Sequence, residues 1–234
     1  MDTVADRELI TRVRAALAAG GDPQRAVAQQ RYMKSAMPFY GLGLPAVRST
    51  LRPILREHPP AAREGWEATT RALWDEATHR EERYAAIELT GIAAARPWQD
   101  PAALALYEHL VRTGSWWDYV DPIASGRVGP ILRGHRAATT VIRAWAVSDD
   151  LWVRRTAILC QLQAGADTDL DLLTAVIDAN TLGTALGSEF FIRKAIGWAL
   201  RQHARTDPDW VRSFVAARSA RLAPLSVREA LKHL

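Results

Sequence analysis

Residues 115–121 read SWWDYVD, so three aromatic side chains and two carboxylates fall within one short segment. Ser115 fits the N-cap of a helix that starts at Trp116. On that helix Trp117 and Asp121 are four residues apart and share one face. An indole beside a carboxylate can bind a flat, positively charged partner. The alternative is structural, because tryptophan pairs usually lie in a core and an aspartate near a helix start usually offsets the helix dipole.

Outward from this segment, helical spacing of apolar residues recurs along almost the whole chain, and no alternating strand pattern competes with it. Breaks fall at Pro, Gly or Asp, as where Asp22 caps a helix that has Pro23 at its first position. Helices are expected at 4–18, 24–33, 46–57, 62–77, 81–95, 101–112, 116–124, 136–147, 151–164, 170–179, 189–204, 208–217 and 226–234, with a Gly- and Pro-rich loop at 37–45. The sequence therefore predicts an all-α fold.

The expected helices form pairs of roughly 35 to 40 residues, the range of HEAT-type repeats. Three related Ala-Ile pairs are each preceded by an arginine, namely Arg83, Arg154 and Arg193. Trp117 and Trp152 stand one repeat apart, and Phe191 follows one repeat later. Such recurrence predicts an α-solenoid of HEAT-like repeats with a concave basic groove, the alternative being that each arginine is a solvated outer-face residue. With no linker or low-complexity tract, residues 1–234 are expected to form one domain.

The charge balance favours an anionic partner. The chain has 234 residues and a formal net charge of +4, with lysine only at positions 34, 194 and 232. Its positive charge is therefore mostly arginine, which binds phosphate bidentately. Biased codon usage in an Ala- and Arg-rich chain is the alternative explanation.

Several classes of protein are disfavoured by what the sequence lacks. The one cysteine, Cys160, lies in an apolar run and reads as a buried thiol in a reducing compartment, not as a nucleophile. No CxxC, HExxH, GxGxxG or Walker pattern is present. We find neither a signal-peptide core nor an apolar run of membrane-spanning length. The sequence thus predicts a cytoplasmic monomer that needs no metal or cofactor and does not enter a membrane.

Two further helices carry candidate binding residues. Arg154 and Arg155 are adjacent and point about 100° apart, so we expect only one to face the core or groove. Lys194 and Trp198 share a face, four residues apart. Gly197 costs up to about 1 kcal/mol against alanine within a helix, which indicates a close approach by another helix or by a ligand.

The strings SWWDYVD, RTAIL, FFIRKAIGW and LAPLSVREALKH, with RYMK and PFYG near the N-terminus, resemble those of the AlkD family of DNA alkylation-repair glycosylases. The match is collinear over nearly the whole chain. The resemblance implies HEAT-like repeats and hydrolytic removal of N3- and N7-alkylated purines from duplex DNA, as in base excision repair, without metal or cofactor. It also implies that the base stays stacked, and that the protein reaches the nucleoid by binding DNA.

Residue by residue, the resemblance makes Asp121 the catalytic aspartate, Trp117 and Trp198 the lesion-facing tryptophans, and Arg155 the active-site arginine. Tyr32 matches a DNA-contacting tyrosine. With the basic residues that the repeat pattern selects, the expected DNA-binding set is Tyr32, Lys34, Arg154, Arg193 and Lys194. Lys194 is expected to contact phosphate, since base-only hydrolysis needs no lysine nucleophile.

Two departures from the family pattern stand out. Pro122 follows the catalytic aspartate, and a residue before proline is pushed away from the helical region, which could shift Trp117 against Asp121. The chain is also a few residues longer between Gly183 and Glu189. Two other functions stay open: a non-catalytic HEAT-repeat protein that binds damaged or branched DNA, and a HEAT-type module for protein interactions.

Overall fold

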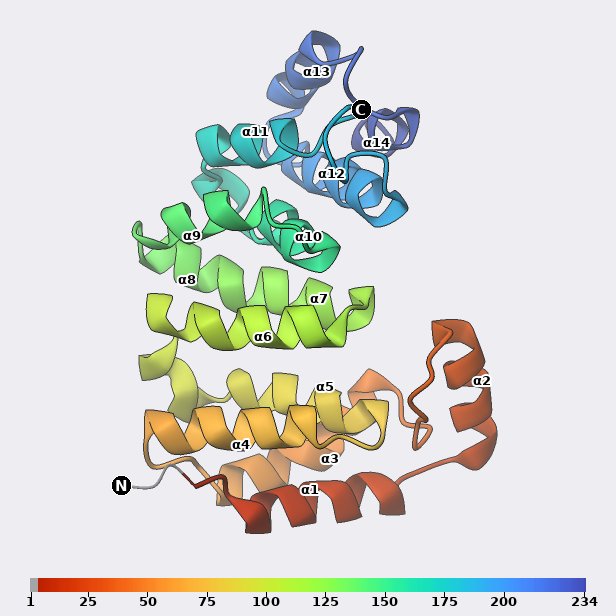
Figure 1. Ribbon diagram of the computed structural model, residues 1–234, viewed down its shortest axis with the longest axis vertical. Helices are drawn as coiled ribbons and strands as arrows, with labels where there is room; N and C mark the ends of the chain where they lie inside the picture. Colours follow the sequence, from red (N-terminus) through yellow and green to blue (C-terminus); the bar gives the residue numbers. More distant parts are fainter. Residues whose placement is uncertain (1–3) are drawn as a thin grey trace. The chain divides into compact units, whose positions relative to one another are not determined.

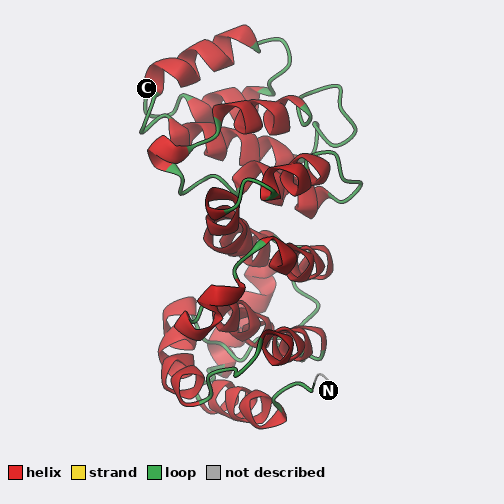
Figure 2. Cartoon of the chain, turned by 90° about the vertical axis from the view of Figure 1, so that its left-hand side faces the viewer, coloured by secondary structure: helices red, strands yellow, loops and turns green. Residues whose placement is uncertain are grey.

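The computed structural model describes residues 4–234. Over that range the chain forms α-helices joined by loops and short 3-10 or π segments, and no β-strand (Figure 2). The predicted all-helical fold is confirmed. The chain divides into two compact units, Met1–Gln99 and Asp100–Leu234. Within each unit the helices stack in the manner of a helical-repeat solenoid (Figure 1), whereas the concave basic groove stays a prediction.

The first unit packs its helices around buried tryptophans. Its elements are α1 Arg7–Ala19, α2 Pro23–Met33, α3 Leu44–Glu57, α4 Arg63–Asp75, α5 Arg80–Thr90 and the 3-10 helix η1 Ala93–Trp98. Trp66 and Trp74 of α4 are fully buried, and Trp66 Nε1 donates to the Leu89 carbonyl of α5 at 3.3 Å. Helix α5 ends before the expected residue 95, because Gly91 caps it and η1 follows.

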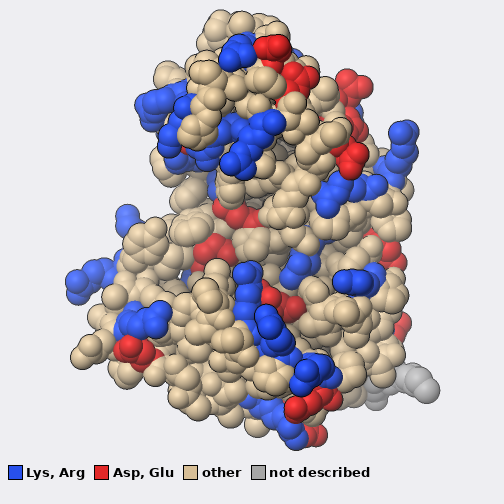
Figure 3. All heavy atoms as spheres, turned by 180° about the vertical axis from the view of Figure 1, so that it is seen from behind, with Lys and Arg blue, Asp and Glu red and all other residues tan. Residues whose placement is uncertain are grey.

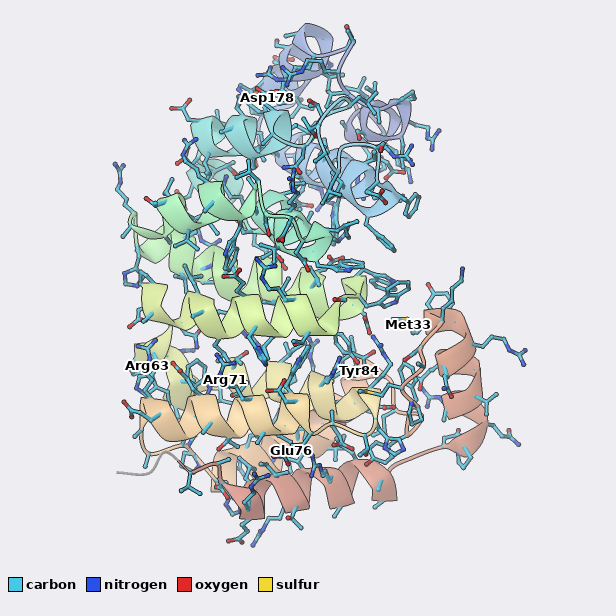
Figure 4. The ribbon with its side chains drawn as sticks, viewed as in Figure 1. Met33, Arg63, Arg71, Glu76, Tyr84 and Asp178 are labelled. Atoms are coloured by element: carbon cyan, nitrogen blue, oxygen red, sulfur yellow. The ribbon has the colours of Figure 1, made fainter. Side chains whose placement is uncertain are left out.

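Charged side chains tie the ends of α1 and α4 together. Glu76, just after α4, pairs with Arg7 of α1 at 2.6 Å (Figure 4). Both side chains are largely exposed, so the pair contributes little to stability.

Two fully buried glutamates at the start of α5 hold the loop over residues 37–45. The carboxylate of Glu81 accepts the backbone N–H groups of Tyr40 at 3.0 Å, Gly41 at 2.8 Å and Leu42 at 3.0 Å. Gly41 has φ +101°, and a Cβ there would lie 2.1 Å from the Asp22 carbonyl oxygen. A buried carboxylate therefore satisfies three consecutive backbone N–H groups of this loop.

The second glutamate, Glu82, is held by side chains. It accepts from Arg14 Nε at 2.8 Å, the Tyr40 hydroxyl at 2.9 Å and Thr78 Oγ1 at 2.8 Å. Burial alone would raise the pKa of Glu82, but these three hydrogen bonds and the charge of Arg14 lower it below its usual value. Burial and the bond to Glu82 raise the pKa of Tyr40 to about 12.

The second unit contains the C-terminal repeats. Its elements are η2 Pro101–Ala103, α6 Leu104–Gly114, α7 Trp117–Ile123, the π-helix η3 Ala124–Val128, α8 Gly129–Gly134, α9 Ala138–Trp145, α10 Leu151–Leu159, η4 Gly165–Asp167, α11 Leu170–Asp178, α12 Phe190–His203, α13 Pro208–Ala217 and α14 Pro224–Ala230. Asp178, the last residue of α11, binds Arg218 after α13 through both oxygens, at 2.7 and 2.9 Å (Figure 4). Sequence-distant helix ends are thus joined within this unit.

A helical run passes through Pro122 without a break, from α7 through η3 into α8. Proline lacks an N–H, yet the helix continues through Pro122 and is followed by the π-helix. Ser125 Oγ donates to the Asp121 carbonyl at 2.9 Å. Trp117 and Asp121 lie one turn apart within the single helix α7, which also contains Pro122.

Helix α8 was not among the helices expected from the sequence, which left residues 125–135 unassigned. Gly126, Gly129 and Pro130 read as helix breakers. The structure explains Gly129 by packing, since a Cβ there would lie 2.3 Å from the Cys160 carbonyl oxygen.

Gly197 lies where α12 and α14 approach each other. A Cβ at this position would be 2.6 Å from Glu229 Cβ and 3.1 Å from the Ser226 carbonyl oxygen. Ser226 Oγ also donates to the Arg193 carbonyl at 2.8 Å. The close approach predicted from Gly197 is confirmed, and the partner is another helix.

Substitution of Gly197 by alanine should lower stability. The extra methyl overpacks the contact with α14, and we expect a net loss of about 1–2 kcal/mol in the free energy of unfolding despite the better helix propensity. The matched control is Gly65→Ala in α4, where a Cβ meets nothing within 4 Å. Denaturant unfolding of both variants checks this, and a Gly197→Ala protein as stable as Gly65→Ala would contradict it.

Replacement of Glu82 by glutamine should remove a pH-dependent part of the stability. Because the folded pKa is lowered, the contribution of Glu82 is present above its unfolded value near 4.5 and is lost as the pH falls through the folded pKa. We expect Glu82→Gln to cost about 1–3 kcal/mol at neutral pH, with the two unfolding curves converging in acid. A difference in the free energy of unfolding between wild type and Glu82→Gln that stays constant down to pH 3 would contradict this.

Candidate active site

Three helices of the second unit meet at one guanidinium group. Arg155 of α10 donates to both oxygens of Asp121 of α7, from Nε to Oδ1 at 2.8 Å and from Nη2 to Oδ2 at 2.9 Å. Its Nη1 donates to the Phe191 carbonyl, in the first turn of α12, at 2.6 Å. The two residues that the sequence singled out on separate repeats are therefore bound directly to each other.

The pair is largely removed from water. The side chain of Asp121 is 13% exposed and that of Arg155 is 6% exposed. Burial raises the pKa of Asp121 above its usual value, the hydrogen bond and charge of Arg155 oppose the shift, and the charge of Asp118 adds to it. In such surroundings a carboxylate acts on neighbouring charge more strongly than it does in water.

Aromatic rings cover the neighbouring parts of the same three helices. The ring centroids of Trp152 and Phe191 lie 4.8 Å apart, and Trp116 lies 5.9 Å from Trp152 and 5.6 Å from Phe191. The Arg155 guanidinium lies 5.8 Å from the Phe191 ring centroid. Phe190, which packs on Phe191 at 5.4 Å, is half exposed. The pair is thus bordered by an aromatic cluster that reaches the surface.

The structure corrects two details of the SWWDYVD segment. Ser115 is not the N-cap: it ends α6 in the left-handed region, with φ 45°, and its Oγ donates to the Arg112 carbonyl at 2.6 Å. Trp116 takes the N-cap position instead. Consequently Trp116, and not Trp117, joins Trp152 and Phe191 in the aromatic cluster.

The two predicted lesion-facing tryptophans are both partly accessible. Trp117 is the first residue of α7, one turn before Asp121, and is half-buried. Trp198 lies on α12, two turns after Phe191, and packs half-buried against the core of the unit. Helical spacing places Trp117 on the face of Asp121 and Trp198 on the face of Phe191.

Arg154 has a different environment from the expected one. Both Arg154 and Arg155 are buried, although only one was expected to be. The Arg154 guanidinium donates to the carbonyls of Ser148 and Val147 and to Asn180 Oδ1. Since these acceptors hold it inside the unit, the geometry gives Arg154 a structural role, and its predicted DNA contact stays a prediction.

Another of the recurring arginines, Arg83, also has a structural role. Arg83 Nε donates to the Trp74 carbonyl at 3.4 Å, and its guanidinium lies 4.9 Å from the Trp74 ring centroid. Arg83 and Arg154 therefore both bind carbonyls at helix ends. The contacts of these two arginines match neither of the two predicted positions, which were the lining of a groove and the solvated outer face.

The other predicted DNA-binding residues remain accessible. Arg193 and Lys194 of α12 are partly exposed, and Lys194 pairs with Glu229 at 3.2 Å. Figure 3 shows Lys and Arg side chains gathered over the C-terminal unit on the face viewed from behind. In the first unit, Tyr32 is 76% exposed and Lys34 is exposed in the left-handed conformation that ends α2. Their contacts with DNA stay predictions.

Sequence reasoning assigned no role in the site to three groups that contact or influence its residues: the Phe191 carbonyl, Asp118 and Glu229. The Phe191 carbonyl and the charge of Asp118 have no signature in a sequence. Glu229 bridges Lys194 and Arg201, and its place in the LAPLSVREALKH string was the one available signal.

Three further features of the described residues concern metal ligands, the cysteine and membrane-spanning helices. Over residues 4–234, no group of three His, Cys, Asp or Glu side chains is arranged to hold a metal ion. Cys160 is buried, as predicted, and burial raises its pKa to about 12. None of the helices described here combines the length and apolarity that a membrane crossing requires.

Comparisons with known proteins identify the family. The family model for the DNA alkylation repair enzyme matches residues 13–234. A solved structure from Enterococcus faecalis, described as a predicted DNA alkylation repair enzyme, is 30% identical in sequence, with a TM-score of 0.75 over 92% of this chain and 96% of that chain. No curated protein matches significantly. The chain belongs to the DNA alkylation repair enzyme family.

Proposed function

We propose that this protein is a monofunctional DNA glycosylase that hydrolyses the N-glycosidic bond of N3- and N7-alkylated purines in duplex DNA. Family membership supports DNA repair as the process. The observation that carries the finer proposal is the buried Asp121–Arg155 pair on the face of α7 that also bears Trp117.

The chemistry needs few groups. An N3- or N7-alkylpurine is positively charged, so its glycosidic bond is already weak and the base leaves as a neutral molecule. Breakage leaves positive charge on the sugar, near C1′. A carboxylate there stabilises that charge and orients the attacking water, by the electrostatic logic of glycoside hydrolysis. We assign this role to Asp121.

The neighbouring groups have supporting roles in this proposal. Trp117 and Trp198 border the sugar and the lesion, select cationic bases through their ring faces and exclude loose water. Arg155 fixes both oxygens of Asp121 and so orients the carboxylate before substrate arrives. Excision without base flipping, which the resemblance to the AlkD family implies, is also part of the proposal.

Substitution of Asp121 by asparagine should separate catalysis from binding. Asparagine keeps the shape and one acceptor oxygen for Arg155 but loses the charge. We expect single-turnover release of 7-methylguanine from a duplex with one such lesion to fall about 10²–10³-fold, the usual cost of losing one transition-state contact. DNA affinity should be nearly unchanged.

The assay is run for wild type and variant with chelator present and no added metal. A thermal melt must show that the variant is folded, since a buried charge now faces a neutral partner. Equal release by the folded variant would remove Asp121 from the mechanism. Binding without release by either protein would favour the alternative, a non-catalytic protein that binds damaged or branched DNA.

A further inference from the structure

Helix α3 carries an arginine at every fourth position along one face. Arg48, Arg52 and Arg56 are all exposed. They line a groove of about 430 Å³ between α3 and the segment that follows α5. Leu51 and Leu55, both buried, contribute its apolar floor. The groove lies wholly within the first unit and contains none of the residues of the Asp121 site.

The groove has an excess of unpaired positive charge. Arg48 pairs with Glu88 at 2.8 Å. The side chains of Arg52 and Arg56, in contrast, have no hydrogen-bond or ion-pair partner among residues 4–234. Glu88 is the one carboxylate among the residues that line this groove. Figure 3 shows a row of Lys and Arg side chains across the N-terminal unit.

The spacing of these charges fits a nucleic-acid strand. Residues 48 to 56 span about 12 Å of helix axis at 1.5 Å per residue. One strand of duplex DNA carries a phosphate about every 3.4 Å of its axis, so this length holds three or four phosphates. Guanidinium groups bind phosphate oxygens bidentately, and two of the three are free to do so.

We propose that the α3 groove, defined by Arg48, Arg52 and Arg56, binds the phosphate backbone of duplex DNA as a contact region distinct from the excision site. The proposal rests on the proposed function in taking duplex DNA as the substrate. Backbone contacts fix position without reading sequence. The groove therefore raises affinity for damaged and undamaged duplexes alike and takes no part in bond cleavage.

The test is the salt dependence of binding to a short undamaged duplex, for wild type and the Arg52→Ala/Arg56→Ala double variant. Loss of two phosphate contacts should reduce the slope of log affinity against log salt by about 1.8. Between 50 and 200 mM salt, the wild type should then lose about twelvefold more affinity than the variant. Single-turnover release of 7-methylguanine at saturating enzyme should be unchanged.

Two controls separate the groove from overall charge. Arg136→Ala/Arg143→Ala removes the same charge from exposed arginines of the second unit, and its salt slope should stay close to that of wild type. Arg52→Lys/Arg56→Lys should largely restore the slope, and thermal melts should match throughout. An equal slope loss in the Arg136/Arg143 variant overturns the proposal, because total charge would then explain the binding.

The outcomes also distinguish this proposal from the proposed function. An unchanged slope with normal excision overturns the α3 contact alone. A reduced slope with no excision by the wild type overturns the glycosylase and supports the DNA contact. If the Arg52→Ala/Arg56→Ala variant binds the duplex as tightly as the wild type but no longer binds a poly-glutamate peptide that the wild type binds, the DNA proposal is overturned. The groove would then be assigned to an acidic protein.

Discussion

The bond between Arg155 and Asp121 is the interaction on which the second unit's candidate site depends. One guanidinium binds both oxygens of a buried carboxylate and also the Phe191 carbonyl, so it links α7, α10 and α12. Burying an ion pair is an inefficient way to stabilise packed helices, because the desolvation cost nearly cancels the attraction. Under the proposed function, the pair serves chemistry that needs a fixed negative charge in a medium of low dielectric constant.

Under the proposed function the two units make different kinds of contact with DNA. The second unit supplies the carboxylate and the indole rings that address sugar and cationic base. The first unit supplies accessible cations along α3 that address phosphates. Within the first unit, the buried carboxylate of Glu81 binds backbone N–H groups of the loop that precedes α3, and Glu82 binds the Tyr40 hydroxyl. Selectivity for cationic lesions and affinity for duplex DNA thus arise from different residues.

Much of the helix pattern could be predicted from the sequence, because it follows from local chemistry. Asp22 caps α2 with Pro23 in its first turn, as expected, and apolar spacing located most of the other helices. Gly197 correctly indicated a close approach. These signals need only neighbouring residues, whereas α8 was missed because Gly129 serves a packing contact with a residue far along the chain.

The candidate site shows the same limit. Asp121 and Arg155 were both identified, but their mutual bond joins residues 34 positions apart and has no local signature. Arg154 looked equivalent to other repeat arginines, yet the carbonyls of its surroundings hold it inside the unit. Ser115 had the residue type of an N-cap but takes a left-handed backbone conformation that ends the preceding helix. Tertiary partners decided the first two outcomes, whereas backbone conformation decided the third.

The central claim is that the negative charge of Asp121 drives excision, and the pH dependence of single-turnover 7-methylguanine release tests it most directly. Because burial raises the pKa of Asp121, the wild-type rate should fall on acidification through a midpoint above the ordinary aspartate value of about 3.9. The residual rate of folded Asp121→Asn should be independent of pH over the same range. An acidic limb that persists unchanged in Asp121→Asn would contradict the account.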